Sequence, residues 1–262
     1  MATLLVAAWT LLAAVLFAQA FTRLRRRGRT DHAGWDRPLL FLAGLALVVG
    51  ALVPPLEEAA EERLSAHMLQ HVLLADSGPA LLLVAVRGPL VVFLLPGAIL
   101  GPLARFQPLR AFSRFLLRPG VSFAVWAAVI AAWHYPAAYE YALEHEPVHA
   151  LEHASFLAAG LLVWTQLVDP ARRGELRIAG RLALAAALFA AGQILADVLI
   201  FSFEPLYGVY GDEADQRLAG VVMMLEQALT LGTCAALLVW AQHQEVVRRE
   251  AAAIRPLGAR EP

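Results

Sequence analysis

The sequence contains no lysine, and all 21 of its basic residues are arginine. Mechanisms that need a lysine amine, such as a retinal Schiff base, are therefore excluded. The single cysteine, Cys234, can form neither an intrachain disulfide nor a cysteine-rich metal site. Charged residues make up only 16% of the chain, against about 25% in soluble proteins. This shortage of charge argues against a soluble domain.

Apolar residues, in contrast, make up 60% of the 262 residues. Seven apolar segments are long enough to cross a bilayer, which takes roughly 17–25 residues each. We therefore predict an all-α, polytopic membrane protein that forms one integral-membrane domain over residues 1–262. The predicted spans are about 2–22, 38–56, 65–86, 119–138, 148–168, 182–202 and 216–241. The stretch 89–104 is apolar but broken by proline and glycine, and we expect it to be interfacial or re-entrant.

Charge alternates between the connections in a way that supports this count. Nineteen of the 21 arginines lie in the connections after spans one, three and five and in the C-terminal tail. Glutamate and aspartate fill the other connections, which hold only Arg63 and Arg217. The positive-inside rule then places the N-terminus outside and the C-terminus in the cytoplasm of a bacterial plasma membrane. The first span is expected to be a retained anchor, because its positive charge follows the apolar run. The arginines are expected to meet anionic lipid, not nucleic acid.

Six of the eight histidines fall at the predicted outer ends of spans: His67, His71, His134, His145, His149 and His153. His67 and His71 are four residues apart, so they share one face of a helix, and His149 and His153 repeat this spacing. Two such pairs on different helices can converge on one metal ion. Neutral imidazole suits copper, zinc, iron and nickel, and nearby methionines would favour Cu(I).

Other polar and aromatic residues support less definite predictions. Asp76, Asp197 and Glu226 lie within predicted spans, where we expect them to be protonated or paired with Gln193 or Gln227. Asp76 is half a helical rotation from His67, so the spacing does not place it in the cluster. The aromatics at the outer boundary are interpreted as an interfacial belt: Trp133, Tyr135, Tyr139, Tyr141, Tyr207 and Tyr210.

Two strings resemble metalloprotease motifs. Residues 145–149 match H-E-x-x-H, but Pro147 belongs at a helix start and leaves His145 outside the helix. Residues 149–153 match H-x-x-E-H and are compatible with a helix. An intramembrane metalloprotease with Glu152 as general base therefore stays open as an alternative.

Several short motifs, in order, resemble the CtaG family of cytochrome c oxidase assembly factors, the type associated with caa3 oxidases. They are residues 67–74 (HMLQHVLL), 133–136 (WHYP) with Tyr139, 149–156 (HALEHASF), 205–207 (PLY) and 215–220 (DQRLAG). The resemblance runs from about residue 35 to 240. Arg217, Met224 and the stretch 225–227 depart from the pattern expected after Asp215. Residues 76–79 (DSGP) also replace a run that is more apolar in the family.

The resemblance implies a multi-pass assembly factor, not an enzyme, whose partners are cytochrome c oxidase subunits and the bilayer. Copper delivery to the oxidase is the expected task. Carried over residue by residue, the candidate metal ligands are His67, His71, His134, His149 and His153. Besides the metalloenzyme, two further alternatives stay open: a haem protein with His71 and His153 as axial ligands, and a scaffold that binds no metal.

Overall fold

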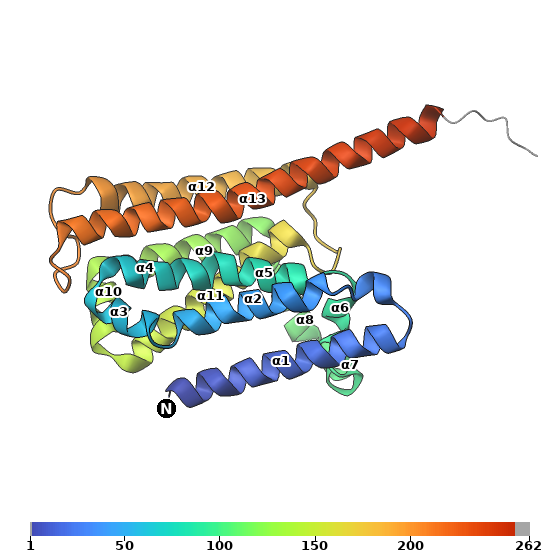
Figure 1. The fold of residues 1–262 in the computed structure, drawn as a ribbon, viewed down its shortest axis with the longest axis horizontal. Coiled ribbons are helices and arrows are strands. Elements are labelled where there is room, and N and C mark those ends of the chain that lie inside the picture. Colours follow the sequence, from blue (N-terminus) through green and yellow to red (C-terminus); the bar gives the residue numbers. More distant parts are fainter. Residues whose placement is uncertain (1, 255–262) are drawn as a thin grey trace, which may run out of the picture.

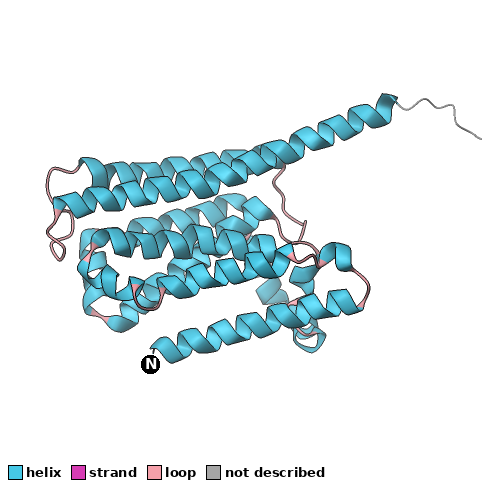
Figure 2. Cartoon of the chain, viewed as in Figure 1, coloured by secondary structure: helices cyan, strands magenta, loops and turns pink. Residues whose placement is uncertain are grey.

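The computed structural model describes residues 2–254, and these form helices without any strand. This confirms the predicted all-α fold class. Six helices are long and apolar enough to cross a membrane. A seventh span results only if α8 and α9, which are bent by 75° relative to each other, count as one. Figure 2 shows that the long helices run roughly alongside one another. The helices, in chain order, are α1 (Ala2–Arg26), α2 (Asp36–Ala51), α3 (Leu56–Glu62), α4 (Leu64–Val72), α5 (Gly78–Val86), α6 (Pro89–Phe93), α7 (Gly97–Arg105), α8 (Gln107–Leu116), α9 (Pro119–Trp133), α10 (Pro136–Glu144), α11 (Glu146–Val168), α12 (Ile178–Phe201) and α13 (Glu213–Ile254), with the short 3-10 helix η1 (Thr30–His32).

The central span is not a uniform α-helix. Between α4 and α5 runs a π-helical turn, η2 (Leu73–Ser77), in which hydrogen bonds connect residues five apart. This span packs against α2, α11 and α13. Gly160 of α11 allows the contact with η2, because a Cβ there would collide with the backbone of Ala75. Small residues at such crossings let membrane helices approach closely.

The outer helices enclose this span to different degrees. The helices α12 and α13 pair along their length on one side of the bundle (Figure 1). On another side α1 lies apart from the bundle for much of its length (Figure 1). The C-terminal half of α1 is held by an apolar cluster in which Phe17 stacks on Phe41 with ring centroids 4.1 Å apart. Exposed apolar side chains on α1 suit contact with lipid.

Two segments differ in detail from the sequence prediction. The fourth span is predicted to reach residue 138, but α9 ends at Trp133. Pro136 accounts for the break, because the residue before a proline avoids helical geometry and Tyr135 is extended. The stretch 89–104 forms α6 and most of α7, and α8 follows as an unpredicted amphipathic helix. On α8, Phe112 and Phe115 are exposed near Arg110 and Arg114, a combination typical of interfacial helices.

The arginine-rich connections and the helix ends that carry the clustered histidines lie at opposite ends of the bundle. Figure 1 shows α3, α10 and the α12–α13 connection together at one end, which we call the histidine end. The connection between α1 and α2 and the helices α6 to α8 lie at the other end. That the histidine end faces away from the cytoplasm stays a prediction of the positive-inside rule.

Candidate metal centre

The helix α4 supplies two buried histidines to the interior of the bundle. His67 and His71 are 0% and 2% exposed, and their ring centroids are 4.4 Å apart. The four-residue spacing aligns them on one helix face, as predicted. The helix begins at Leu64, directly after Arg63, whose extended backbone separates α4 from α3.

The helix α11 supplies the second histidine pair. It begins at Glu146, with Pro147 in its first turn and His145 outside it, as the proline predicted. His149 is half-buried and His153 is buried, with ring centroids 4.3 Å apart. Because α9 and α11 are joined by the short helix α10, the two long helices pack as neighbours.

The two pairs converge. The ring of His67 lies 5.2 Å from that of His149 and 5.9 Å from that of His153, and the rings of His71 and His153 are 5.7 Å apart. One potential ligand atom from each of His67, His149 and His153 lies within 4.8 Å of the others. Small side-chain movements would bring such a set to the nitrogen–metal distances of about 2 Å found in metal sites.

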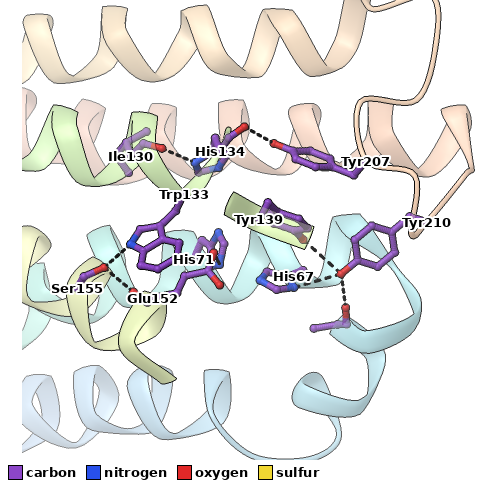
Figure 3. Close-up of polar contacts among 11 residues, drawn as sticks. His67, His71, Ile130, Trp133, His134, Tyr139, Glu152, Ser155, Tyr207 and Tyr210 are labelled. Atoms are coloured by element: carbon purple, nitrogen blue, oxygen red, sulfur yellow. Dashed lines mark hydrogen bonds and ion pairs between the residues drawn. The ribbon is translucent and has the colours of Figure 1, made fainter. Parts of the chain in front are cut away.

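His134 lies next to this cluster and outside its tightest groups. It follows the last residue of α9, and its ring is 5.8 Å from that of His71. Its Nδ1 lies 2.9 Å from the carbonyl oxygen of Ile130 (Figure 3). Among the described residues it belongs to neither group that could hold a metal ion. The structure thus brings together four of the five predicted ligands and leaves His134 at the border.

Glu152 is a member of the cluster that the predicted ligand set did not include. Its side chain is fully buried, and Oε1 lies 3.4 Å from Nε2 of His71. His67, His71 and Glu152 form a second group of ligand atoms within 4.8 Å of one another. The H-x-x-E-H string places Glu152 on the same helix as His149 and His153, but its contact with His71 on α4 could not be read from that spacing.

Three tyrosines, Tyr139, Tyr207 and Tyr210, lie beside the histidines of α4 and α9 (Figure 3). Tyr139 and Tyr207 are 0% and 2% exposed, so their assignment to an interfacial belt was wrong. Tyr135 and Tyr141 are exposed and do suit such a belt. Burial raises the pKa of Tyr139 and of Tyr207, and it raises the pKa of Tyr210 to about 12. The three hydroxyls therefore keep their protons at neutral pH.

The imidazole nitrogens of the cluster are poorly supplied with hydrogen bonds. In each of the five histidines, at least one buried ring nitrogen has no hydrogen-bond partner within the described part of the chain. These atoms are His67 Nε2, His71 Nδ1 and Nε2, His134 Nε2, His149 Nε2 and His153 Nε2. A buried polar atom without a partner costs about 1–3 kcal/mol. Such nitrogens with free lone pairs are what a soft or borderline metal ion needs. The arrangement could therefore hold a metal ion.

A cavity of about 20 Å³ extends the cluster into the bundle. His71, His134, Asp76 and Gln227 are among its lining residues. Asp76 reaches it because the π-helical turn η2 shifts the residues after His71 around the helix axis. A regular α-helix would have turned Asp76 about 140° away from His71.

The intramembrane acids have partners other than the glutamines expected. Trp164 Nε1 donates to Asp76 at 3.1 Å. Ser77 and Thr230 donate to Glu226 at 2.5 and 2.6 Å. The side chain of Asp197 is exposed on α12. The carboxyl group of Asp76 therefore links η2 to α11, and that of Glu226 links η2 to α13.

A comparison with protein families agrees with the motifs. A family model described as cytochrome c oxidase caa3 assembly factor matches residues 15–244, which include every residue of the cluster. No curated protein and no solved structure matches the chain. The family match covers most of the sequence and confirms the resemblance drawn from the motifs. The chain belongs to the family of cytochrome c oxidase caa3 assembly factors.

Proposed function

We propose that this protein binds copper at its histidine cluster and helps deliver it to a cytochrome c oxidase. Family membership supplies the assembly role. The observation that carries the copper site is the convergence of His67, His149 and His153 from two helices within 4.8 Å. The site would face the non-cytoplasmic side of a bacterial plasma membrane, as the arginine distribution predicts.

The ligand set favours a monovalent ion. Three neutral imidazoles add no charge, and among the described residues Glu152 supplies the carboxyl group of the two ligand groups. A Cu(I) ion balanced by one carboxylate would carry no net charge, whereas a divalent ion would leave one positive charge inside the bundle. Uncompensated charge is costly at this depth. Cu(I) is therefore the proposed cargo.

The cluster has a graded depth that suits delivery. His149 is half-buried, whereas His67, His71 and His153 are buried. The two ligand groups share His67. An ion bound to His67 could therefore move from the pair His149 and His153 to the pair His71 and Glu152. An ion held this way would enter and leave past His149. A delivery site must release its cargo, which is why we expect moderate affinity.

Copper analysis of purified protein tests the site. The variant combines His67→Ala, His149→Ala and His153→Ala, and its matched control combines His32→Ala and His243→Ala, which lie far from the cluster in sequence. We expect bound copper in the wild type and in the control, and its loss in the triple variant. Equal copper in all three proteins would refute the site, provided that thermal melting shows each to be folded.

A cellular experiment tests the assembly role. Deletion is expected to remove oxidase activity, and added copper is expected to restore part of it. If the triple histidine variant complements the deletion fully at low copper, the protein is a scaffold and copper delivery is wrong. That result would leave the assembly role intact.

One observation favours a second candidate, a membrane metalloenzyme. The carboxyl group of Glu152 lies beside potential metal ligands, as a general base would. Glu152→Gln separates the two candidates. A metalloenzyme loses its activity at any copper concentration, whereas an assembly factor keeps its function when copper is in excess. The haem alternative is not proposed, because the cavity beside His71, at about 20 Å³, is far too small for a porphyrin.

A further inference from the structure

The connection between α12 and α13, residues 202–212, contributes no ligand among the described residues but contacts the cluster at two points. Tyr207 donates its hydroxyl proton to the carbonyl oxygen of His134 at 3.0 Å. The hydroxyl oxygen of Tyr210 lies 3.2 Å from Nδ1 of His67 (Figure 3). The backbone NH of Tyr210 donates to the carbonyl oxygen of Tyr207 at 3.3 Å, so one turn carries both side chains.

The hydrogen bonds of Tyr210 determine the direction of its contact with His67. A tyrosine hydroxyl has one proton to donate. Tyr210 donates it to the carbonyl oxygen of Ala60 at 2.8 Å, and a carbonyl oxygen can only accept. The hydroxyl of Tyr139 donates to Tyr210 at 3.3 Å. Tyr210 must therefore also accept at its third contact, where the donor is Nδ1–H of His67.

This assignment defines the tautomer of the imidazole. A neutral imidazole carries one proton, so a protonated Nδ1 leaves the lone pair on Nε2. Nε2 of His67 is buried and has no hydrogen-bond partner among the described residues. The ring of Tyr139 lies 5.0 Å from that of His67 and limits rotation of the imidazole. The free lone pair is thus held inside the cluster.

We propose that Tyr210 is a positioning residue of the metal centre, which fixes the tautomer and orientation of His67 so that Nε2 is the ligand atom. The metal part of this inference rests on the proposed function. Groups that hold the second nitrogen of a ligand histidine typically change metal affinity 10–100-fold. The α12–α13 connection thereby controls a ligand on α4 without contacting the ion.

His71 provides a contrast within the same helix. Neither of its ring nitrogens has a hydrogen-bond partner among the described residues, and Oε1 of Glu152 lies 3.4 Å from its Nε2. Its tautomer is therefore not fixed by a neighbour. The effect of Tyr210 should be confined to His67.

The variant Tyr210→Phe tests the inference, because it keeps the ring and removes the hydroxyl. The matched control is Tyr141→Phe, whose exposed ring stacks on His145 away from the cluster. The first measurement uses metal-free protein with 15N-labelled histidine, and His67→Ala identifies the His67 signal by NMR. We expect a protonated Nδ1 in the wild type and in the control, and a mixture of tautomers in Tyr210→Phe.

The second measurement is the affinity for Cu(I), from competition with a chelator. We expect a 10–100-fold loss in Tyr210→Phe and none in Tyr141→Phe. A wild-type His67 protonated on Nε2, or a Tyr210→Phe variant with unchanged tautomer and affinity, would overturn the inference. If the wild type binds no copper, the proposed function fails, and the NMR measurement still decides the tautomer. If Tyr210→Phe does not fold, the wild-type tautomer alone tests the inference: a proton on Nδ1 supports it, and a proton on Nε2 overturns it.

Discussion

Replacing Gly160 with alanine is expected to destabilise the protein strongly, because α11 touches the π-helical turn η2 at this residue. A Cβ built on Gly160 would lie 2.8 Å from the carbonyl carbon and 2.9 Å from Cα of Ala75, and closer still to the carbonyl oxygen. Optimal carbon–carbon contacts are about 3.5–4.0 Å. All three atoms belong to the backbone, so no change of rotamer relieves the clash.

The two helices must therefore separate by roughly 0.7 Å or more to bring the shorter carbon–carbon distance to ordinary contact. Overpacking of this kind costs about 1–3 kcal/mol, and occasionally more. Since the strained atoms are main-chain, we expect a value near the upper end, about 3 kcal/mol. A chain of roughly this size loses about 2–4 °C in Tm per kcal/mol, which gives a decrease of about 6–12 °C.

Thermal melting of detergent-solubilised protein measures this decrease, and Gly232→Ala is the matched control. Gly232 also lies within a helix, α13, but nothing occupies the space where its Cβ would be. Alanine there should leave Tm unchanged or raise it slightly, since alanine favours helix more than glycine does. Equal Tm values for Gly160→Ala and Gly232→Ala would refute the close contact between α11 and η2.

Three further substitutions test hydrogen bonds that hold the centre and its supporting helices, each by the change in Tm. Tyr207→Phe removes the donor to the carbonyl oxygen of His134 and should cost about 1–3 kcal/mol; no loss would mean that water replaces the hydroxyl. Asp76→Leu should cost a similar amount by leaving Trp164 Nε1 without an acceptor, whereas Asp76→Asn should cost less, and equal losses would contradict the assignment. Arg37→Met removes a guanidinium that donates to three carbonyl oxygens at the C-terminal end of α5, at 3.1–3.2 Å, and should cost about 1–3 kcal/mol. Amide hydrogen exchange should rise first at this end of α5, and unchanged exchange would argue against these hydrogen bonds.

The sequence predicts helices and the histidine convergence well, because both depend on short-range spacing. Apolar runs long enough to span are visible in composition alone. The pairs His67 with His71 and His149 with His153 follow from the helical repeat. The short α10 between α9 and α11 helps to make those two long helices neighbours.

Long-range side-chain contacts could not be predicted in the same way. Glu152 and Tyr139 are as buried as any core residue, but their neighbours come from other helices. Tyr210 reaches His67 across 143 residues of sequence. Nothing in the local spacing of a tyrosine near a predicted membrane boundary separates a buried hydrogen-bond donor from a member of an interfacial belt.

Asp76 shows why helical spacing alone can misplace a residue. The 3.6-residue repeat turns it away from the histidines, so the spacing leaves it outside the cluster. The structure inserts a π-helical turn directly after His71 and Val72, and the wider turn brings Asp76 onto the same cavity. Such a turn is tolerated where a neighbour accepts the displaced backbone, and Gly160 leaves the necessary space. Gly160, the π-helical turn η2 and the buried Asp76 therefore depend on one another, and we expect a substitution at Gly160 to change the position of Asp76.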